Sequence, residues 1–457
     1  MAQQLKLVLR DDFTSDIADT SLISFTDGFQ LAYAGWTPSY PEDRDEDDNV
    51  PESITLRAKG TSENNLASLV QEIAERKKQV DQYRENAVEP YGIWLRTQYG
   101  SEGNARQALV TDIRRRTSSP YEKIGVSDYK LSEYQLGLMR KAWWEDTAST
   151  TFTGSNLHAI GGSATYTGNV GDIHARLAQV KLLADNVVGH SRFWLGFRPS
   201  RYGTAANFQS TWSLRLGNNF GDDTTGGTDN ADATARDGYK VVCDFGGETG
   251  LVQRVNIIAD GVTANESDQR GEFQVLLRAK NSAAGTTRVR LRSGWYNDFP
   301  QSRSRVAISS TAWLLYDMGT VNIPNSRLKG GAQSLVYYGF AIDAEQVSGT
   351  PDLELDCLIL IPRNEGFVYA DMTGEASFTS SLPYYAYHRA DGKKECDAQD
   401  AGGRVVASTA PDISGGLPVA PGIMVIAADA GTASAFTTID VELKVYQRWD
   451  WLRGSET

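Results

Sequence analysis

The chain has 457 residues, which is enough for about two or three domains with sizeable apolar cores. Its 58 acidic residues outnumber its 45 basic ones, and the formal net charge of −13 argues against a broad nucleic-acid interface, since phosphate contacts need clustered Lys and Arg. The hydrophobic share of 40% excludes a largely disordered chain.

The three cysteines, Cys243, Cys357 and Cys396, are scattered and form no CxxC pair. An odd count of this kind does not resemble a disulfide framework, so we expect buried free thiols at Cys243 and Cys357, which sit in apolar strand patterns. The first residues contain no apolar signal core, and no apolar run approaches the ~20 residues of a membrane span. We therefore expect a protein that is made in the cytoplasm and inserts into no membrane.

The N-terminal third is predicted to combine short strands with one helix. From Leu66 the apolar period becomes helical, with Leu69, Ile73 and Val80 near one face, which predicts one amphipathic helix over about 66–86. The strand patterns of this region lie at 4–10, 27–34, 52–58, 93–96 and 108–116.

The middle of the chain consists of strand-length segments that follow one another without a helical pattern. Turn clusters rich in Gly, Ser, Asn and Asp separate them, which predicts an antiparallel sandwich over 151–374. In one of these strands, Phe273 and Leu277 are predicted to face the core while Gln274 and Arg278 face solvent.

The last strand pattern is the clearest in the chain. Residues Ile439 to Gln447 alternate apolar and charged side chains, which predicts a strand with one face on a core. We expect this strand to belong with the first third of the sequence. The predicted fold class is thus mainly β: a discontinuous β-rich domain with one helix, formed by 1–150 and 375–457, interrupted by the inserted sandwich at 151–374.

Three stretches carry a resemblance for the discontinuous domain: 91–95 (YGIWL), 417–422 (LPVAPG) and 441–445 (VELKV). Together with the order of strands and helix, they resemble the distal-tail or minor-tail (baseplate) proteins of long-tailed bacteriophages. The resemblance implies a virion protein of the tail, assembled in the host cytoplasm, that forms a homo-oligomeric ring, often a hexamer. It also implies contacts with the tail tube and with the tail-tip hub.

The inserted segment resembles the jelly rolls of carbohydrate-binding modules. The stretches that carry this likeness are 271–279 (GEFQVLLRA), 313–319 (WLLYDMG) and 355–362 (LDCLILIP). Such modules are commonly borne by tail and baseplate proteins, so the resemblance implies a sandwich that faces outward and is available to bind a host surface glycan.

Enzymatic signals are weak. The four histidines form no HxH or HExxH pair, and the sequence contains no GxGxxG, Walker or GxSxG motif. Asp317, Glu354 and Asp356 lie in strands and could approach one another as a glycosidase pair would, but we interpret them as structural acids. The sequence therefore predicts no catalytic residue, no cofactor and no metal, although Asp222, Asp223, Asp229 and Asp232 could also ligate calcium.

Glycan binding is the activity that the residues favour. Sugar sites combine flat aromatic rings with hydrogen-bonding side chains, and the segment Trp295, Tyr296, Asn297 and Asp298 has that composition. It leaves a strand in which Val289 and Leu291 face inward while Arg288, Arg290 and Arg292 line the opposite face. We therefore take Trp295 to Asp298 with Arg290 and Arg292 as the candidate glycan site. The alternative is a loop that packs on the sandwich edge or on a neighbouring subunit.

Candidate assembly contacts are a basic cluster, Arg114, Arg115 and Arg116, and two C-terminal tryptophans, Trp449 and Trp451. The cluster could meet the acidic loop at 42–48 of a neighbouring subunit, and such complementarity guides assembly more than it adds affinity. Two alternatives to a tail protein stay open at this point: a free-standing glycan-binding or polysaccharide-degrading protein, and a capsid decoration or fibre protein.

Overall fold

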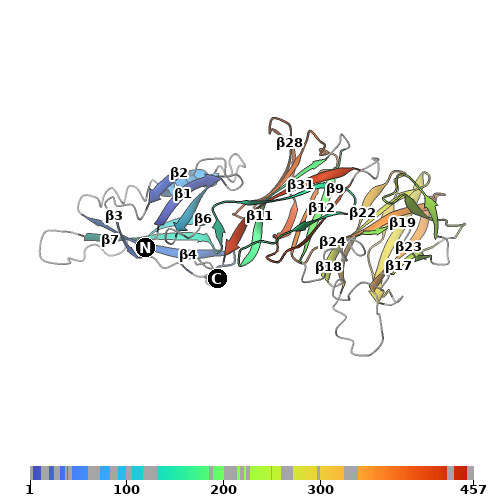
Figure 1. The fold of residues 1–457 in the computed structure, drawn as a ribbon, viewed down its shortest axis with the longest axis horizontal. Coiled ribbons are helices and arrows are strands. Elements are labelled where there is room, and N and C mark those ends of the chain that lie inside the picture. The colour runs from blue at the N-terminus through green and yellow to red at the C-terminus, as the bar shows by residue number, and fades with distance from the viewer. Residues whose placement is uncertain are drawn as a thin grey trace, which may run out of the picture.

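The computed structural model describes residues 4–11, 20–24, 31–35, 39, 44–59, 71, 73–82, 91–98, 105–116, 131–184, 189–199, 214–216, 221–222, 227–248, 250–258, 271–295, 299–323, 338–429 and 437–449. Within these ranges the protein is mainly β, which confirms the predicted fold class, and its paired strands run antiparallel. Figure 1 shows three lobes in a row. We call them the N-terminal lobe (4–141), the middle lobe (144–199 and 366–449) and the distal lobe (214–362).

The N-terminal lobe is a curled sheet with one helix against it. The helix covers 73–82, inside the predicted range, and its Ile73 and Val80 are buried; the remaining residues of the predicted helix lie outside the described ones, apart from helical Gln71. Ile73 packs with Leu5, Leu95 and Val110 of the sheet. The strands are β1 (Gln4–Asp11), β2 (Thr20–Ser24), β3 (Leu31–Gly35), β4 (Asn49–Lys59), β5 (Tyr91–Gln98), β6 (Arg106–Arg116) and β7 (Leu131–Lys141).

A three-residue strand, β8 (Trp144–Asp146), joins this sheet to the middle lobe. β8 pairs with β6 on one side and with the last strand, β31 (Thr438–Trp449), on the other. The same sheet then continues through the middle lobe. Its further strands are β9 (Thr150–His158), β11 (Ile173–Ala184), β26 (Tyr384–His388), β27 (Lys394–Gln399) and β28 (Val405–Thr409).

A second sheet of the middle lobe is buried on both faces. On one side, Leu195 and Ile426 pack with Leu443 of the first sheet. On the other side, Trp194 and Val425 join the core of the distal lobe. Alternate side chains of one sheet thus serve two cores, as the period of two in a strand dictates. The strands are β10 (Gly162–Tyr166), β12 (Arg192–Pro199), β25 (Gly366–Asp371), β29 (Asp412–Gly415) and β30 (Gly422–Ala428).

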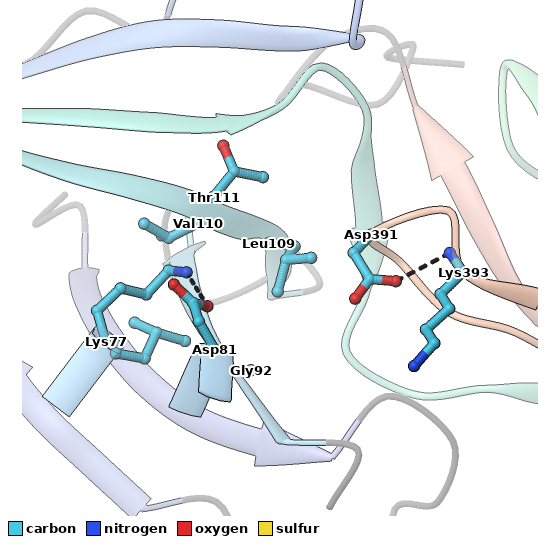
Figure 2. A pocket seen from close by; sticks show the side chains of 9 residues that line it. Lys77, Asp81, Gly92, Leu109, Val110, Thr111, Asp391 and Lys393 are labelled. Carbon is cyan, nitrogen blue, oxygen red and sulfur yellow. Dashed lines mark hydrogen bonds and ion pairs between the residues drawn. The ribbon is translucent and has the colours of Figure 1, made fainter. Parts of the chain in front are cut away.

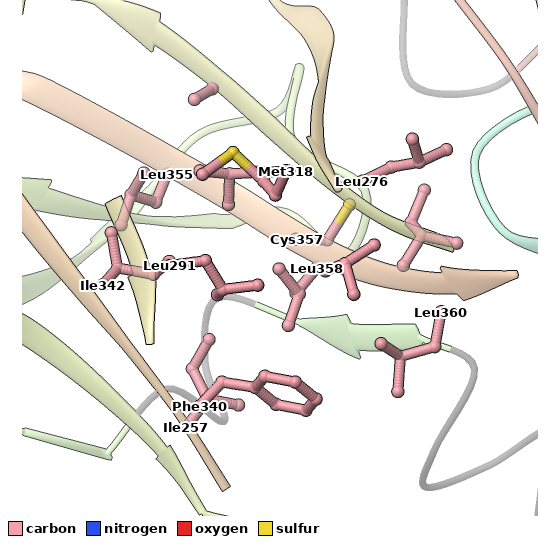
Figure 3. Packing of buried hydrophobic residues seen from close by; sticks show 14 of the residues in the cluster. Ile257, Leu276, Leu291, Met318, Phe340, Ile342, Leu355, Cys357, Leu358 and Leu360 are labelled. Carbon is pink, nitrogen blue, oxygen red and sulfur yellow. The ribbon is translucent and has the colours of Figure 1, made fainter. Parts of the chain in front are cut away.

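The distal lobe is a sandwich of two sheets. Figure 3 shows part of its core, in which Leu358 and Leu360 lie with Leu291, Phe340 and Ile342 of the facing sheet. The sheet nearer the middle lobe contains β13 (Leu214–Leu216), β15 (Gly227–Ala231), β16 (Tyr239–Cys243), β18 (Gly271–Asn281), β22 (Leu314–Ile323) and β24 (Leu353–Pro362). The outer sheet contains β14 (Gly221–Asp222), β17 (Val252–Ile258), β19 (Gly285–Trp295), β20 (Gln301–Ser302), β21 (Val306–Ile308) and β23 (Tyr338–Gly349).

The middle and distal lobes meet backbone to backbone at Gly196. A Cβ atom at this position would lie 2.1 Å from the carbonyl oxygen of Pro362, so any side chain would push β12 away from β24. The glycine is what allows the two sheets to approach closely enough to share one core.

Several sequence predictions are confirmed. Ile439, Val441, Leu443 and Val445 of β31 are buried, as the alternation predicted. The two predicted buried thiols, Cys243 and Cys357, are also found free and buried, and Cys396 is free and buried as well. The division into an interrupted domain and an insertion stays a prediction, since β31 pairs with β8 near the end of the first segment and with β9 and β11 beyond it.

The expectation that Gln274 and Arg278 of β18 face solvent is wrong. Both side chains are buried because the outer face of this strand is covered by other parts of the chain. Arg278 forms an ion pair with Asp356, donates a hydrogen bond to the carbonyl of Thr234 and lies over the ring of Trp313. A period of two identifies the two faces of a strand but cannot tell whether a second layer covers the polar one.

Candidate functional site

The arginines of the predicted glycan site lie on the outer face of the distal sandwich. On β19, Val289 and Leu291 are fully buried, and the alternate residues Arg290 and Arg292 point away from the core, as predicted. Both arginines bind Asp343 of the neighbouring strand β23. The contacts are 2.5 Å from Arg290 Nη2 and 2.8 Å from Arg292 Nη2.

The geometry around Arg292 fixes its guanidinium from several sides. Its Nη2 donates to Gln253 Oε1 at 2.5 Å, and its guanidinium carbon lies 5.8 Å from the centre of the Phe299 ring. Phe299 itself is buried. Because these partners are in place before any ligand arrives, the guanidinium loses little rotamer entropy on binding.

The aromatic part of the predicted site falls largely outside the described residues. The backbone of Trp295 ends β19 and pairs with Tyr338, and nothing is described of its side chain. Tyr296, Asn297 and Asp298 lie outside the described residues altogether. Their role in binding a sugar stays a prediction.

The three carboxylates considered as a glycosidase pair each have a neighbour that occupies them. Asp356 is fully buried; burial raises its pKa, against the opposing effect of its ion pair with Arg278. Glu354 lies between two amines, 2.8 Å from Lys240 Nζ and 3.2 Å from Lys280 Nζ. Asp317 accepts a hydrogen bond from Gln274 and one of 2.7 Å from the backbone of Gly319. These contacts suit structural acids, and the absence of enzymatic activity stays a prediction.

Of the carboxylates named as calcium ligands, only Asp232 has a described side chain; Asp223 lies outside the described residues, and the side chains of Asp222 and Asp229 are not described. Asp232 lies 3.2 Å from Lys240 Nζ and also bonds the hydroxyl of Thr234. Lysine ammonium groups beside the carboxylate take the place that a cation would occupy. Across the described part of the chain, no group of three or more His, Cys, Asp or Glu residues has the placement of a metal site.

The candidate assembly residues lie apart: the basic cluster is at the end of β6 that is remote from β8, whereas Trp449 pairs with β8 at the boundary of the N-terminal and middle lobes. Arg114, Arg115 and Arg116 end β6, where their backbone pairs with β7; their side chains are outside the description. Trp449 is used within the chain: its indole N–H donates to Asp146 Oδ1 at 2.9 Å. Trp451 lies outside the described residues.

The ring of Trp449 also makes a cation–π contact with Arg106. Its centre lies 4.0 Å from the guanidinium carbon of Arg106. The acidic loop is described over 44–48, where all five residues are exposed. Whether Trp449, the basic cluster or this loop also contacts another subunit stays a prediction.

Sequence reasoning missed a cleft of about 400 Å³ between the N-terminal and middle lobes. Figure 2 shows the helix residues Lys77 and Asp81, which form an ion pair, on one side and the turn residues Asp391 and Lys393 on the other. The lining also includes Thr111 of β6. No local pattern could have revealed this cleft, because four separate segments of the sequence form it.

Comparison with known proteins gives little. No protein-family model matches the chain, and no curated protein does. Among solved structures, a chain of the infectious bursal disease virus Gt strain is similar over 66% of this chain and 80% of its own, with 10% identity and a TM-score of 0.17. The VP2 subviral particle of the same virus is similar over 66% and 80%, with 8% identity and a TM-score of 0.16. These scores are too low to support an argument about this chain.

Proposed function

We propose that the protein is a structural component of a virus particle: a tail-tip or baseplate protein of a long-tailed phage that forms an oligomeric ring and holds the distal sandwich outward. Its partners would be further copies of itself, the tail tube and the tail-tip hub. The observation that supports this most directly is the way in which the three lobes are joined, because both junctions suit a stiff arm.

The first junction is a continuous sheet with a buried ionic cluster. β8 lies between β6 and β31, and Glu145 on β8 binds Arg176 at 2.7 Å and Arg448 at 3.0 Å. Burial alone would raise the pKa of Glu145, but the two arginines lower it to about 2. A buried carboxylate held by two guanidiniums tolerates little change in geometry, so β8, whose other edge pairs with β6 of the N-terminal lobe, is held firmly on the rest of the middle lobe.

The second junction is apolar. Trp194, Val425 and Ile423 of the middle lobe are buried in one cluster with the distal core, and Gly196 lets β12 lie against β24. Lobes that share a core do not move independently, in contrast to domains joined by a linker. The distal sandwich is thus presented at a fixed distance and angle from the N-terminal lobe, as a displayed module of an assembly requires.

Light scattering with negative-stain imaging of the purified full chain tests this proposal. We expect closed rings of one size, and we expect the charge reversal Arg114→Glu, Arg115→Glu, Arg116→Glu to shift the protein toward monomers. The matched control, Lys394→Glu with Arg404→Glu, changes exposed charges of the middle lobe and should leave the rings intact. A chain that stays monomeric at every concentration and degrades polysaccharide by itself would contradict the proposal.

A further inference from the structure

A row of four arginines covers the outer sheet of the distal lobe. Arg288, Arg290 and Arg292 follow one another at every second position of β19, and Arg305, just before β21, reaches the same face. Arg305 Nη1 lies 2.9 Å from Glu345 Oε1, and Arg288 Nη1 lies 3.9 Å from the same oxygen. We call these four side chains the arginine face.

The arginine face has more arginines than acidic side chains to pair with them. In the register of β19 with β23, Arg288 stands opposite Glu345 and Arg290 opposite Asp343, so each of these pairs is a complete cross-strand ion pair. Arg292 stands opposite Ala341, and Arg305 belongs to neither strand. Among the residues that the structure describes, two acids therefore serve four arginines, which leaves an excess of two positive charges on this face of a chain whose net charge is −13.

The face is also accessible and ordered. The side chains of Arg288 and Arg305 are 48% and 49% exposed, whereas Asp343 is almost completely buried beneath Arg290 and Arg292. The buried acid orients the guanidinium groups of Arg290 and Arg292, whose side chains remain 30% and 25% exposed. Successive β19 side chains on one face are about 6.7 Å apart, so the donors form a line rather than a single pocket.

From this arrangement we infer that the arginine face binds an acidic polysaccharide, a linear chain of sugars that bear carboxylates. Arginine forks bind planar carboxylates bidentately, and Arg290 and Arg292 already hold one carboxylate, that of Asp343, between them. A line of such donors fits a repeating polymer better than a single small anion. The inference rests on the proposed function, since it specifies the class of host glycan that the displayed sandwich would meet.

The choice of a polysaccharide over nucleic acid follows from the rest of the chain. The excess of 13 negative charges opposes the approach of double-stranded DNA, which carries one negative charge per about 1.7 Å of its axis, while a sugar chain with at most one carboxylate per residue is repelled less. Gln253, which already bonds Arg292, places an amide beside the guanidinium groups, and amides suit sugar hydroxyls.

The test measures binding of the full chain to polygalacturonate, alginate and hyaluronan by biolayer interferometry at low and high salt. Methyl-esterified polygalacturonate is the matched uncharged ligand. We expect salt-sensitive binding to at least one of the three acidic polymers and none to the ester. The double variant Arg288→Gln, Arg305→Gln should lower that affinity at least about tenfold. Arg290 and Arg292 are left in place, because Asp343 is only 3% exposed and would lose its partners, whereas Glu345, the partner of Arg288 and Arg305, is 15% exposed and within reach of water.

The control variant Lys394→Gln, Arg404→Gln removes the same charge from the middle lobe and should bind like the unchanged protein. Absence of salt-sensitive binding to all three acidic polymers, or equal loss in both variants, would overturn the inference. Equal or tighter binding to single-stranded DNA would overturn the assignment to a polysaccharide. Light scattering on the same samples separates the two proposals: rings without polymer binding contradict only this inference, and binding by a permanent monomer contradicts only the ring.

Discussion

The two junctions both hold neighbouring lobes together, but one uses charged side chains and the other uses apolar side chains. At the junction of the N-terminal and middle lobes, charges hold the linking strand β8 in place, with Glu145 between Arg176 and Arg448. The junction of the middle and distal lobes depends on apolar contact, with Trp194 in a shared core. Apolar burial supplies stability without direction, whereas a buried ion pair adds little net stability but penalises every other arrangement. We infer that the first junction fixes the orientation of the N-terminal lobe on the middle lobe. The second junction supplies most of the stability of the contact between the middle and distal lobes.

The largest expected effect comes from emptying the apolar junction. Trp194→Ala removes a fully buried ring that stacks on Tyr369 at 5.1 Å between centroids. The loss of contact and the cavity should lower the free energy of unfolding by about 4 kcal/mol. Chemical denaturation followed by tryptophan fluorescence and circular dichroism measures this. Tyr239→Ala, at a residue that is 47% exposed, is the control and should change stability by less than about 0.5 kcal/mol. Similar losses in both variants would contradict a stabilising core at this junction.

The polar junction should be sensitive to loss of one charge. Glu145→Gln leaves Arg176, which is fully buried, and Arg448 without their shared carboxylate. We expect a loss of about 3 kcal/mol, most of it the cost of a buried unpaired cation. Glu442→Gln on the same sheet changes the net charge equally and is the control. A loss under about 1 kcal/mol would mean that water reaches the cluster of Glu145, Arg176 and Arg448. It would contradict the claim that the first junction depends on buried charges.

Acid should weaken the polar junction. The pKa of Glu145 is lowered on folding from 4.5 to about 2, so the unfolded chain binds this proton more tightly. Its contribution to stability is therefore complete above pH 4.5 and is lost as the pH falls from about 4.5 through about 2. Denaturation midpoints measured across this range should fall more steeply for the unchanged protein than for Glu145→Gln. Parallel curves would contradict the assignment.

The smallest effect concerns a single hydrogen bond. Trp449→Phe removes the donor to Asp146 but keeps an aromatic ring beneath the guanidinium of Arg106. We expect a loss of about 1 kcal/mol in the free energy of unfolding, measured by the same denaturation. Asp146→Asn is the companion variant, because its amide oxygen can still accept from the indole and should cost less. A larger loss in Asp146→Asn would show that the electrostatic attraction between Asp146 and Arg106 dominates this contact.

The sequence predicted what depends on local periodicity. The alternation in β31 and in β19 correctly identified Val441, Leu443, Val289 and Leu291 as buried. The helical period correctly placed Ile73 and Val80 in the core. These predictions succeed because the period of a strand or helix fixes which side chains share a face, whatever lies opposite.

What the sequence could not predict depends on contacts between distant segments. The burial of Arg278 requires a second layer, and the use of Trp449 within the chain requires Asp146, about three hundred positions earlier in the sequence. The arginine face was found only in part, since Arg305 reaches it from outside β19. Pairing between remote strands is set by the total burial of the fold, and no window of sequence contains that information.

The brevity of β8 has a consequence for how the molecule would respond to tension. In the described part of the chain, the strand pairing that links the N-terminal sheet to the middle lobe runs through two residue pairs of β8 with β6 and two with β31. A pull along the row of lobes in Figure 1 would load these few pairs and the charges of Glu145 before it loads either sandwich. Under force the strand pairing of β8 and the ion pairs of Glu145 would then break first, while the lobes on each side remain folded. The force required would vary with salt and pH, because ion pairs depend on both.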